Sequence, residues 1–169
     1  MHIRQERPAD YPEIYQLVKE AFATAEHADG SEQDLVEALR KSPAYLPELA
    51  LVAEEDGQLA GHILLTRARV GEDPVLVLAP LSVRPAFQRR GVGTALMREA
   101  HGIARARGED YVLVLGSEHY YPRVGYRPAE ELGAAVPAGF PSANFMALRL
   151  REEAKPLSGE VIYPPEFGL

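Results

Sequence analysis

The segment Gln88-Arg89-Arg90-Gly91-Val92-Gly93-Thr94 has the residue types of a phosphate-binding loop. It follows an apolar run that ends at Val83 and leads into a run of good helix formers. The first N–H groups of a helix lack intrahelical partners, and the helix dipole adds a partial positive charge, so both favour an anion there. Glycines also let the backbone approach an anion without a Cβ clash. We predict a polyphosphate site; a solvated tight turn before a helix is the alternative.

Charge supports the polyphosphate interpretation locally, although the chain as a whole is acidic. The sequence has 18 Lys and Arg against 25 Asp and Glu, a net charge of −7. Arg84, Arg89 and Arg90 nevertheless form a basic cluster within seven residues. ATP is disfavoured as the ligand because there is no G-x-x-x-x-G-K-[ST] motif. NAD is disfavoured because Leu96 stands where the G-x-G-x-x-G motif needs its third glycine.

The elements around this loop begin with a short strand and two helices. Ile3 opens the strand. Asp10 and Glu13 have the spacing of a capping box ahead of an amphipathic first helix. Ser31 and Asp34 can cap a second helix.

Strands make up most of the remaining chain. Glu55-Asp56-Gly57 is typical of a hairpin turn between two antiparallel strands. The run 75–83 is apolar almost throughout, as in a strand that is covered on both faces. A helix closed by Gly108 separates it from the next buried strand, and this order favours parallel pairing. The predicted strands are 49–54, 58–70, 75–83, 111–115 and 144–150, followed by an irregular tail from Pro156.

Two motifs together resemble one family. Residues 88–93 fit the [RQ]-x-x-G-x-[GA] signature of the general N-acetyltransferase (GNAT) superfamily, between the expected strand and helix. Residues 120–126, Tyr-Tyr-Pro-Arg-Val-Gly-Tyr, resemble the family's aromatic-Tyr-x-x-x-Gly-aromatic segment after the next strand. The resemblance is strongest over 75–127 and extends to Met1 through the order of the elements.

This resemblance implies a fold and a co-substrate. The fold is α/β (α+β), with a mixed, mainly antiparallel central sheet flanked by helices and with splayed central parallel strands. Residues 1–169 would form a single domain with a C-terminal tail at 151–169. The co-substrate would be acetyl-CoA, with its pyrophosphate on the loop and its pantetheine arm paired to the strand backbone. The implied acetyl-CoA-binding residues are Leu81, Ser82, Val83, Gln88, Arg89, Arg90, Gly91, Val92, Gly93 and Thr94.

Tyr121 is the implied catalytic residue. It matches the tyrosine that in many family members donates a proton to the CoA sulfur, and a phenol with a pKa near 10 suits a thiol leaving group near 8.5. The alternative is that Tyr120, Tyr121 and Tyr126 only pack as aromatic side chains. The chain departs from the family at 115–119, where the usual asparagine is absent.

The general base is left open among several candidates. If the resemblance holds, all of them lie in segments that face the acceptor cleft, and each also suits a solvated loop or a helix cap. A water chain could serve instead. The candidates are Glu26, His27, Glu32, Glu118 and His119.

Some chemistry is excluded or disfavoured by composition. The sequence has no cysteine, so an acetyl-cysteine intermediate is excluded. We expect no metal, because the five histidines lack ligand spacing. The family resemblance, together with the absence of cysteine, implies direct acetyl transfer from acetyl-CoA to a primary amine of a small molecule, peptide or protein. The alternative is a non-catalytic acyl-CoA sensor or interaction module on the same scaffold.

Location and partners follow from charge and hydropathy. No run approaches the roughly 20 apolar residues of a membrane helix, and the charged start does not suit a signal peptide, so we expect a cytoplasmic protein without a membrane partner. The acidic balance disfavours nucleic acid. Because family members are often dimers, we expect the tail with Tyr163 and Phe167 either to pack across a homodimer interface or to cover its own core.

Overall fold

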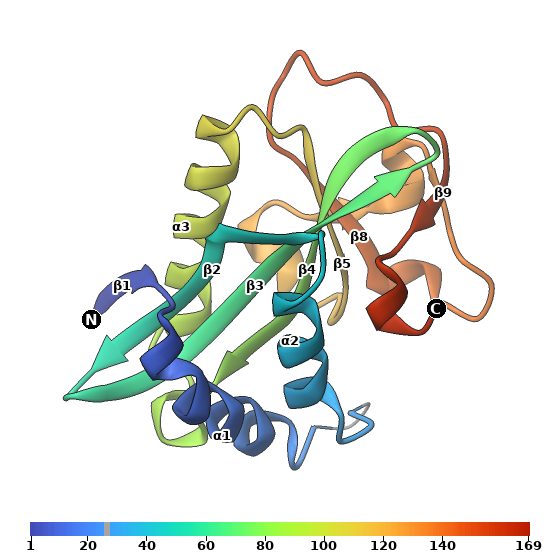
Figure 1. Ribbon diagram of the computed structural model, residues 1–169. Coiled ribbons are helices and arrows are strands. Elements are labelled where there is room, and N and C mark those ends of the chain that lie inside the picture. Colours follow the sequence, from blue (N-terminus) through green and yellow to red (C-terminus); the bar gives the residue numbers. More distant parts are fainter. Residues whose placement is uncertain (26–27) are drawn as a thin grey trace. The chain divides into compact units, whose positions relative to one another are not determined.

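A computed structural model describes residues 1–25 and 28–169 (Figure 1). These residues divide into two units. Unit 1 comprises Met1–Thr66 and Ala79–Ile103, and unit 2 comprises Arg67–Leu78 and Ala104–Leu169. The expectation of a single domain stays a prediction.

The helices are α1 (Tyr11–Phe22), α2 (Glu32–Arg40) and α3 (Val92–Ala106). The strands are β1 (His2–Gln5), β2 (Tyr45–Glu55), β3 (Gln58–Val70), β4 (Asp73–Val83), β5 (Tyr111–Leu115), β6 (Arg127–Pro128), β7 (Ala134–Ala135), β8 (Phe145–Arg149) and β9 (Gly159–Ile162). Short 3₁₀ helices include Pro85–Phe87, Tyr121–Val124 and Ser142–Asn144. No helix among the described residues is long and apolar enough to cross a membrane.

Unit 1 contains an antiparallel sheet in the order β1-β2-β3. The predicted hairpin turn joins β2 and β3, with Glu55 opposite Gln58. β2 starts at Tyr45, earlier than the predicted residue 49, and its register shifts between Tyr45 and Ala50. Pro47 and this irregularity break the alternating pattern, which is why the sequence missed the start of the strand.

Helices cover both faces of this sheet. A Cβ at Gly61 would lie 2.9 Å from side-chain atoms of Val92 and Leu96, so α3 packs closely on that face of β3. His62, the next residue, points to the opposite face and reaches Glu6. α1 buries Ile14, Leu17 and Val18, and α2 buries Val36 and Leu39. The apolar faces of both helices therefore contribute to the core.

Unit 2 contains the predicted parallel pair. Leu76 and Val77 of β4 pair with Val112 and Leu113 of β5. β8 runs antiparallel to β5, and the two-residue strand β6 runs antiparallel to β8. A mixed, mainly antiparallel sheet with helices was therefore the right expectation.

The C-terminal tail is more regular than predicted. β9 pairs antiparallel with β3, with Arg69 opposite Ile162, and parallel with β7. The sequence prediction of an irregular tail was wrong, because the tail's prolines lie outside the four residues that pair. Tyr163 contacts Phe140 and Phe167, so the tail covers part of its own unit.

Asp10 and Ser31 occupy the N-cap positions of α1 and α2, but neither side chain caps its helix. The Asp10 carboxylate does not cap α1 but accepts hydrogen bonds from the Arg4 side chain and the Arg7 N–H. Ser31 does occupy the N-cap position of α2, yet its hydroxyl donates to Asp29. Tertiary partners and neighbouring loop residues compete for these side chains, which sequence spacing alone does not show.

Candidate functional site

The predicted phosphate-binding loop connects β4 to α3 in unit 1. The Arg84 N–H donates to the Ala60 carbonyl at 2.8 Å, which fixes the end of β4 beside β3. The Gln88 side-chain amide then donates to the Val83 carbonyl at 3.2 Å. The loop therefore leaves a firmly paired strand and enters α3 at Val92.

Gly91 has the backbone conformation that the loop needs. Its φ is +80°, in the left-handed region, and a Cβ there would meet nothing within 4 Å. Arg89 also has a left-handed φ, of 64°. The Gly91 carbonyl accepts the Ala95 N–H at 3.0 Å, so the first turn of α3 forms directly after it. Open space beside a helix N-terminus is what a pyrophosphate requires, and the residues present fit acetyl-CoA.

The predicted cluster of three arginines is reduced to two. Arg84 donates to Glu20 at 3.0 Å and to the Leu59 carbonyl at 3.0 Å, and it lies 3.4 Å from Glu13. Including Arg84 in the cluster was wrong, because these carboxylates from α1 already balance its charge. Arg89 and Arg90 are exposed, and the Arg90 guanidinium lies 5.4 Å from the centre of the Phe87 ring.

The three strand residues predicted to meet the pantetheine arm end β4. Leu81 and Val83 are half-buried, and Ser82 is buried with 1% of its surface exposed. The Ser82 hydroxyl has no hydrogen-bond partner among the described residues. An unpartnered buried hydroxyl is costly to folding.

Tyr121, the predicted catalytic residue, lies in unit 2. It begins the 3₁₀ helix Tyr121–Val124 after β5. Its ring makes edge-to-face contacts with Tyr120, at 5.2 Å between centres, and with Tyr126, at 5.5 Å. Tyr126 is 2% exposed and belongs to the core, so the packing role considered for these tyrosines holds for Tyr126.

The hydroxyl of Tyr121 keeps its proton at neutral pH. Burial, with a smaller contribution from Tyr120, raises the pKa of Tyr121 well above 10. Among the described residues the hydroxyl forms no hydrogen bond, although the ring is held on several sides. This arrangement suits a proton donor as well as an aromatic packing residue.

Of the candidate bases Glu26, His27 and Glu32, the structure describes Glu32. Glu26 and His27 lie outside the described residues. Glu32, the first residue of α2, accepts the N–H of the loop residue Asp29 at 3.1 Å. Its other carboxylate oxygen is buried without a hydrogen-bond partner among the described residues.

The candidates in unit 2 are close together. His119 is exposed and lies 3.4 Å from the carboxylate of Glu118. The pKa of Glu118 is lowered by its own backbone N–H and by a hydrogen bond from Asn144. A lowered pKa makes Glu118 a weaker base, so a water chain remains an alternative.

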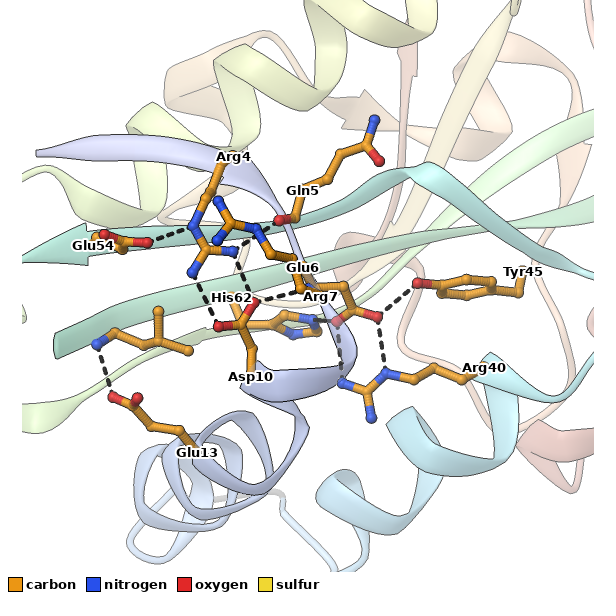
Figure 2. Close-up of polar contacts among 11 residues, drawn as sticks. Arg4, Gln5, Glu6, Arg7, Asp10, Glu13, Arg40, Tyr45, Glu54 and His62 are labelled. Carbon is orange, nitrogen blue, oxygen red and sulfur yellow. Dashed lines mark hydrogen bonds and ion pairs between the residues drawn. The ribbon is translucent and has the colours of Figure 1, made fainter.

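A buried polar network in unit 1 was missed by the sequence analysis (Figure 2). The Glu6 carboxylate, 1% exposed, accepts hydrogen bonds from Arg40 at 2.8 and 3.0 Å and from the Tyr45 hydroxyl at 2.6 Å. His62 Nε2 lies 2.9 Å from the same carboxylate. These residues are scattered along the chain, so no spacing pattern could reveal them. The network joins β2, β3 and α2 to the segment after β1.

No group of three or more metal-ligating side chains gathers in the part of the chain that the structure describes. The polar clusters found there instead contain ion pairs, such as that of Glu6 with Arg40.

Comparison with known proteins gives consistent results. The model of the acetyltransferase (GNAT) family matches residues 11–126. The uncharacterized N-acetyltransferase YjhQ of Escherichia coli strain K12 is 35% identical over 161 residues, which cover 90% of this chain and 86% of that protein.

Two solved structures are similar over nearly the whole chain. A GNAT family acetyltransferase from Brucella melitensis in complex with acetyl-CoA has a TM-score of 0.82 and 34% identity, covering 98% of this chain and 97% of that one. YhbS from Escherichia coli in complex with CoA has a TM-score of 0.88 and 26% identity, covering 99% and 92%.

Proposed function

The chain belongs to the GNAT family of acetyltransferases, and from that premise we propose that it moves an acetyl group from acetyl-CoA to a primary amine of a small molecule, peptide or protein. As a member it is an acetyl-CoA-dependent acetyltransferase. The proposal concerns the acceptor, the direct route of transfer and the residues that carry it.

The main support for acetyl-CoA binding at this loop is the backbone geometry at Gly91. A left-handed glycine with open space beside it directly precedes α3, whose first N–H groups have no intrahelical acceptor. We assign the pyrophosphate of acetyl-CoA to residues 88–94, with Arg89 and Arg90 adding charge. The backbone of residues 81–83 pairs with the pantetheine arm, and an N–H there stabilises negative charge on the acetyl oxygen.

Bound acetyl-CoA supplies an activated acetyl group. The acceptor must present a neutral nitrogen, which forms the new C–N bond as the C–S bond breaks. We assign Tyr121 the proton that the sulfur receives, and the proton lost by the nitrogen returns to Tyr121 through water or a carboxylate. Its raised pKa keeps Tyr121 protonated across the neutral range, so phenol ionisation does not limit the rate below about pH 10.

Charge indicates which acceptors to try first. The net charge of −7 favours the approach of cations, apart from the local basic charge of Arg89 and Arg90. We therefore propose a cationic amine, such as a polyamine or a lysine-containing peptide, as the preferred acceptor class.

The experiment combines calorimetry with a thiol-release assay. Acetyl-CoA is titrated into the protein first, and CoA release is then followed over a panel of polyamines, basic peptides and neutral amines. The proposal expects binding, amine-dependent CoA release and an equal amount of acetylated amine by mass spectrometry. Binding without CoA release from any amine would favour the non-catalytic sensor, and absence of binding would contradict both.

A further inference from the structure

The backbone of Gly116, just after β5, is held by a single residue. The Gly116 N–H donates to the Asn144 carbonyl at 2.9 Å, and the Asn144 side-chain amide donates to the Gly116 carbonyl at 2.9 Å. The same amide nitrogen also donates to the Glu118 carboxylate. The Gly116 carbonyl and the Glu118 carboxylate both accept hydrogen bonds, so the nitrogen end of the Asn144 side-chain amide must face them. Asn144 therefore fixes both polar groups of Gly116 and the turn that follows it.

The Tyr121 ring lies directly against Gly116. A Cβ at Gly116 would be 2.4 Å from Cε2 of Tyr121, 3.1 Å from Cδ2 and 3.3 Å from Cζ. These atoms form one edge of the ring, from Cδ2 to Cζ, and Cζ carries the hydroxyl oxygen. The Tyr121 ring can occupy this position only because residue 116 has no Cβ. The Gly116 backbone forms one wall of the space that holds the ring.

The Tyr121 ring also contacts two other tyrosines, but its hydroxyl has no hydrogen-bond partner among the described residues. Tyr120 and Tyr126 meet the Tyr121 ring edge to face, with ring centres 5.2 and 5.5 Å away. We therefore expect a shift of Gly116 to displace the Tyr121 ring and the hydroxyl that it carries.

We infer that Asn144 is a positioning residue for the Tyr121 hydroxyl and acts through the backbone of Gly116. The inference rests on the proposed role of Tyr121 as proton donor. Proton transfer depends steeply on the placement of the donor, so a displacement of about 1 Å is enough to reduce turnover strongly. Binding of acetyl-CoA, assigned to other residues, should be spared.

The test measures kcat and the acetyl-CoA Kd for Asn144→Ala in the wild-type and in the Tyr121→Phe backgrounds. In the wild-type background we expect a roughly tenfold fall in kcat with Kd unchanged within about twofold. In the Tyr121→Phe background the same substitution should change kcat by less than about twofold, because the hydroxyl it positions is gone.

Three further variants separate positioning from general disruption. Asn144→Asp keeps the shape but cannot donate when ionised, so it should lose as much kcat as Asn144→Ala. Gly116→Ala should also lower kcat, since its Cβ displaces the ring. Ser142→Ala, at an exposed position of the same 3₁₀ turn, should leave kcat unchanged.

The outcomes distinguish this inference from the proposed function. Unchanged kcat in Tyr121→Phe itself would overturn the role of Tyr121. If Tyr121→Phe is slow but Asn144→Ala keeps full kcat, or loses as much in the Tyr121→Phe background, the positioning role is overturned. Should Asn144→Ala fail to fold, Asn144→Asp and Gly116→Ala are compared in the two backgrounds with the same expectations.

Discussion

Glu6 shows how opposing effects set the charge of a buried residue. Burial favours its neutral form and raises the pKa, but hydrogen bonds from His62, Arg40 and Tyr45 outweigh burial and hold the pKa at about 2, below the ordinary 4.5. A pKa difference of one corresponds to about 1.4 kcal/mol, so ionised Glu6 contributes about 3 kcal/mol to folding at neutral pH.

The lowered pKa of Glu6 determines how folding stability changes with pH. Because the folded pKa lies below the unfolded one, the contribution of Glu6 is complete above about pH 4.5 and is lost as the pH falls towards 2. Glu6→Gln should cost about 3 kcal/mol at pH 7 and flatten the loss of stability between pH 4.5 and 2. Urea unfolding across that range measures both effects.

Glu131→Gln is the matched control, since Glu131 pairs with Arg127 at an exposed site. It should cost less than about 0.5 kcal/mol. Glu6→Gln with wild-type stability and an unaltered acid transition would show that the network is not what stabilises unit 1.

Gly91 makes a second prediction at the scale of one residue. Gly91→Ala forces a side chain into the left-handed region, at a cost of about 1 kcal/mol, and places a methyl group in the space assigned to the pyrophosphate. We expect the acetyl-CoA Kd to rise roughly tenfold by calorimetry.

Gly139, which belongs to unit 2 and not to the loop, offers a control with the same backbone strain, since its φ is +86° and its Cβ would also meet open space. Gly139→Ala should lose similar stability and keep the acetyl-CoA Kd. If both variants bind acetyl-CoA as the wild type does, the loop does not contact the pyrophosphate.

At the scale of elements, Gly61 sets how closely α3 approaches β3. An added Cβ would lie 2.9 Å from Val92 and Leu96 and 3.1 Å from the Ser82 carbonyl. Gly61→Ala should therefore cost about 1–3 kcal/mol by overpacking and weaken acetyl-CoA binding, because the start of α3 must move. Thermal unfolding and calorimetry measure the two effects.

Gly102 is the corresponding control within α3. Its Cβ would meet open space, so Gly102→Ala should stabilise the helix by about 0.5–1 kcal/mol. A stable Gly61→Ala variant with normal affinity would mean that α3 can shift without affecting the loop.

Helices and strands were predicted well where the spacing of apolar residues and the turn-forming residues indicate the same element. The hairpin at Asp56-Gly57, the parallel pairing of β4 with β5 and the helix between them all follow from local pattern. Asp10 and Ser31 occupy the expected N-cap positions, but their side chains bond to other partners, and the tail strand β9 was missed. Their partners lie in loops or distant segments, and spacing along the chain carries no information about them.

For the whole molecule, the family was identifiable from two short motifs, and the comparisons confirm it. The supporting residues were not identifiable. Asn144 lies 28 residues from Gly116, and Glu6 lies 56 residues from His62. Such pairs exist only after folding, so a motif indicates a candidate reacting group but not the residues that hold it. The acidic net charge likewise concealed that Arg84 is already paired with Glu20.

We propose that residues 81–83 and 88–94 bind acetyl-CoA and that Tyr121 donates the proton, so a single variant should separate the two functions. The most direct measurement is kcat together with the acetyl-CoA Kd for Tyr121→Phe, with the best amine acceptor. We predict that kcat falls roughly 100-fold while Kd stays within about twofold of the wild-type value. Wild-type kcat, or a fall that is matched by an equal loss of acetyl-CoA affinity, would contradict the account.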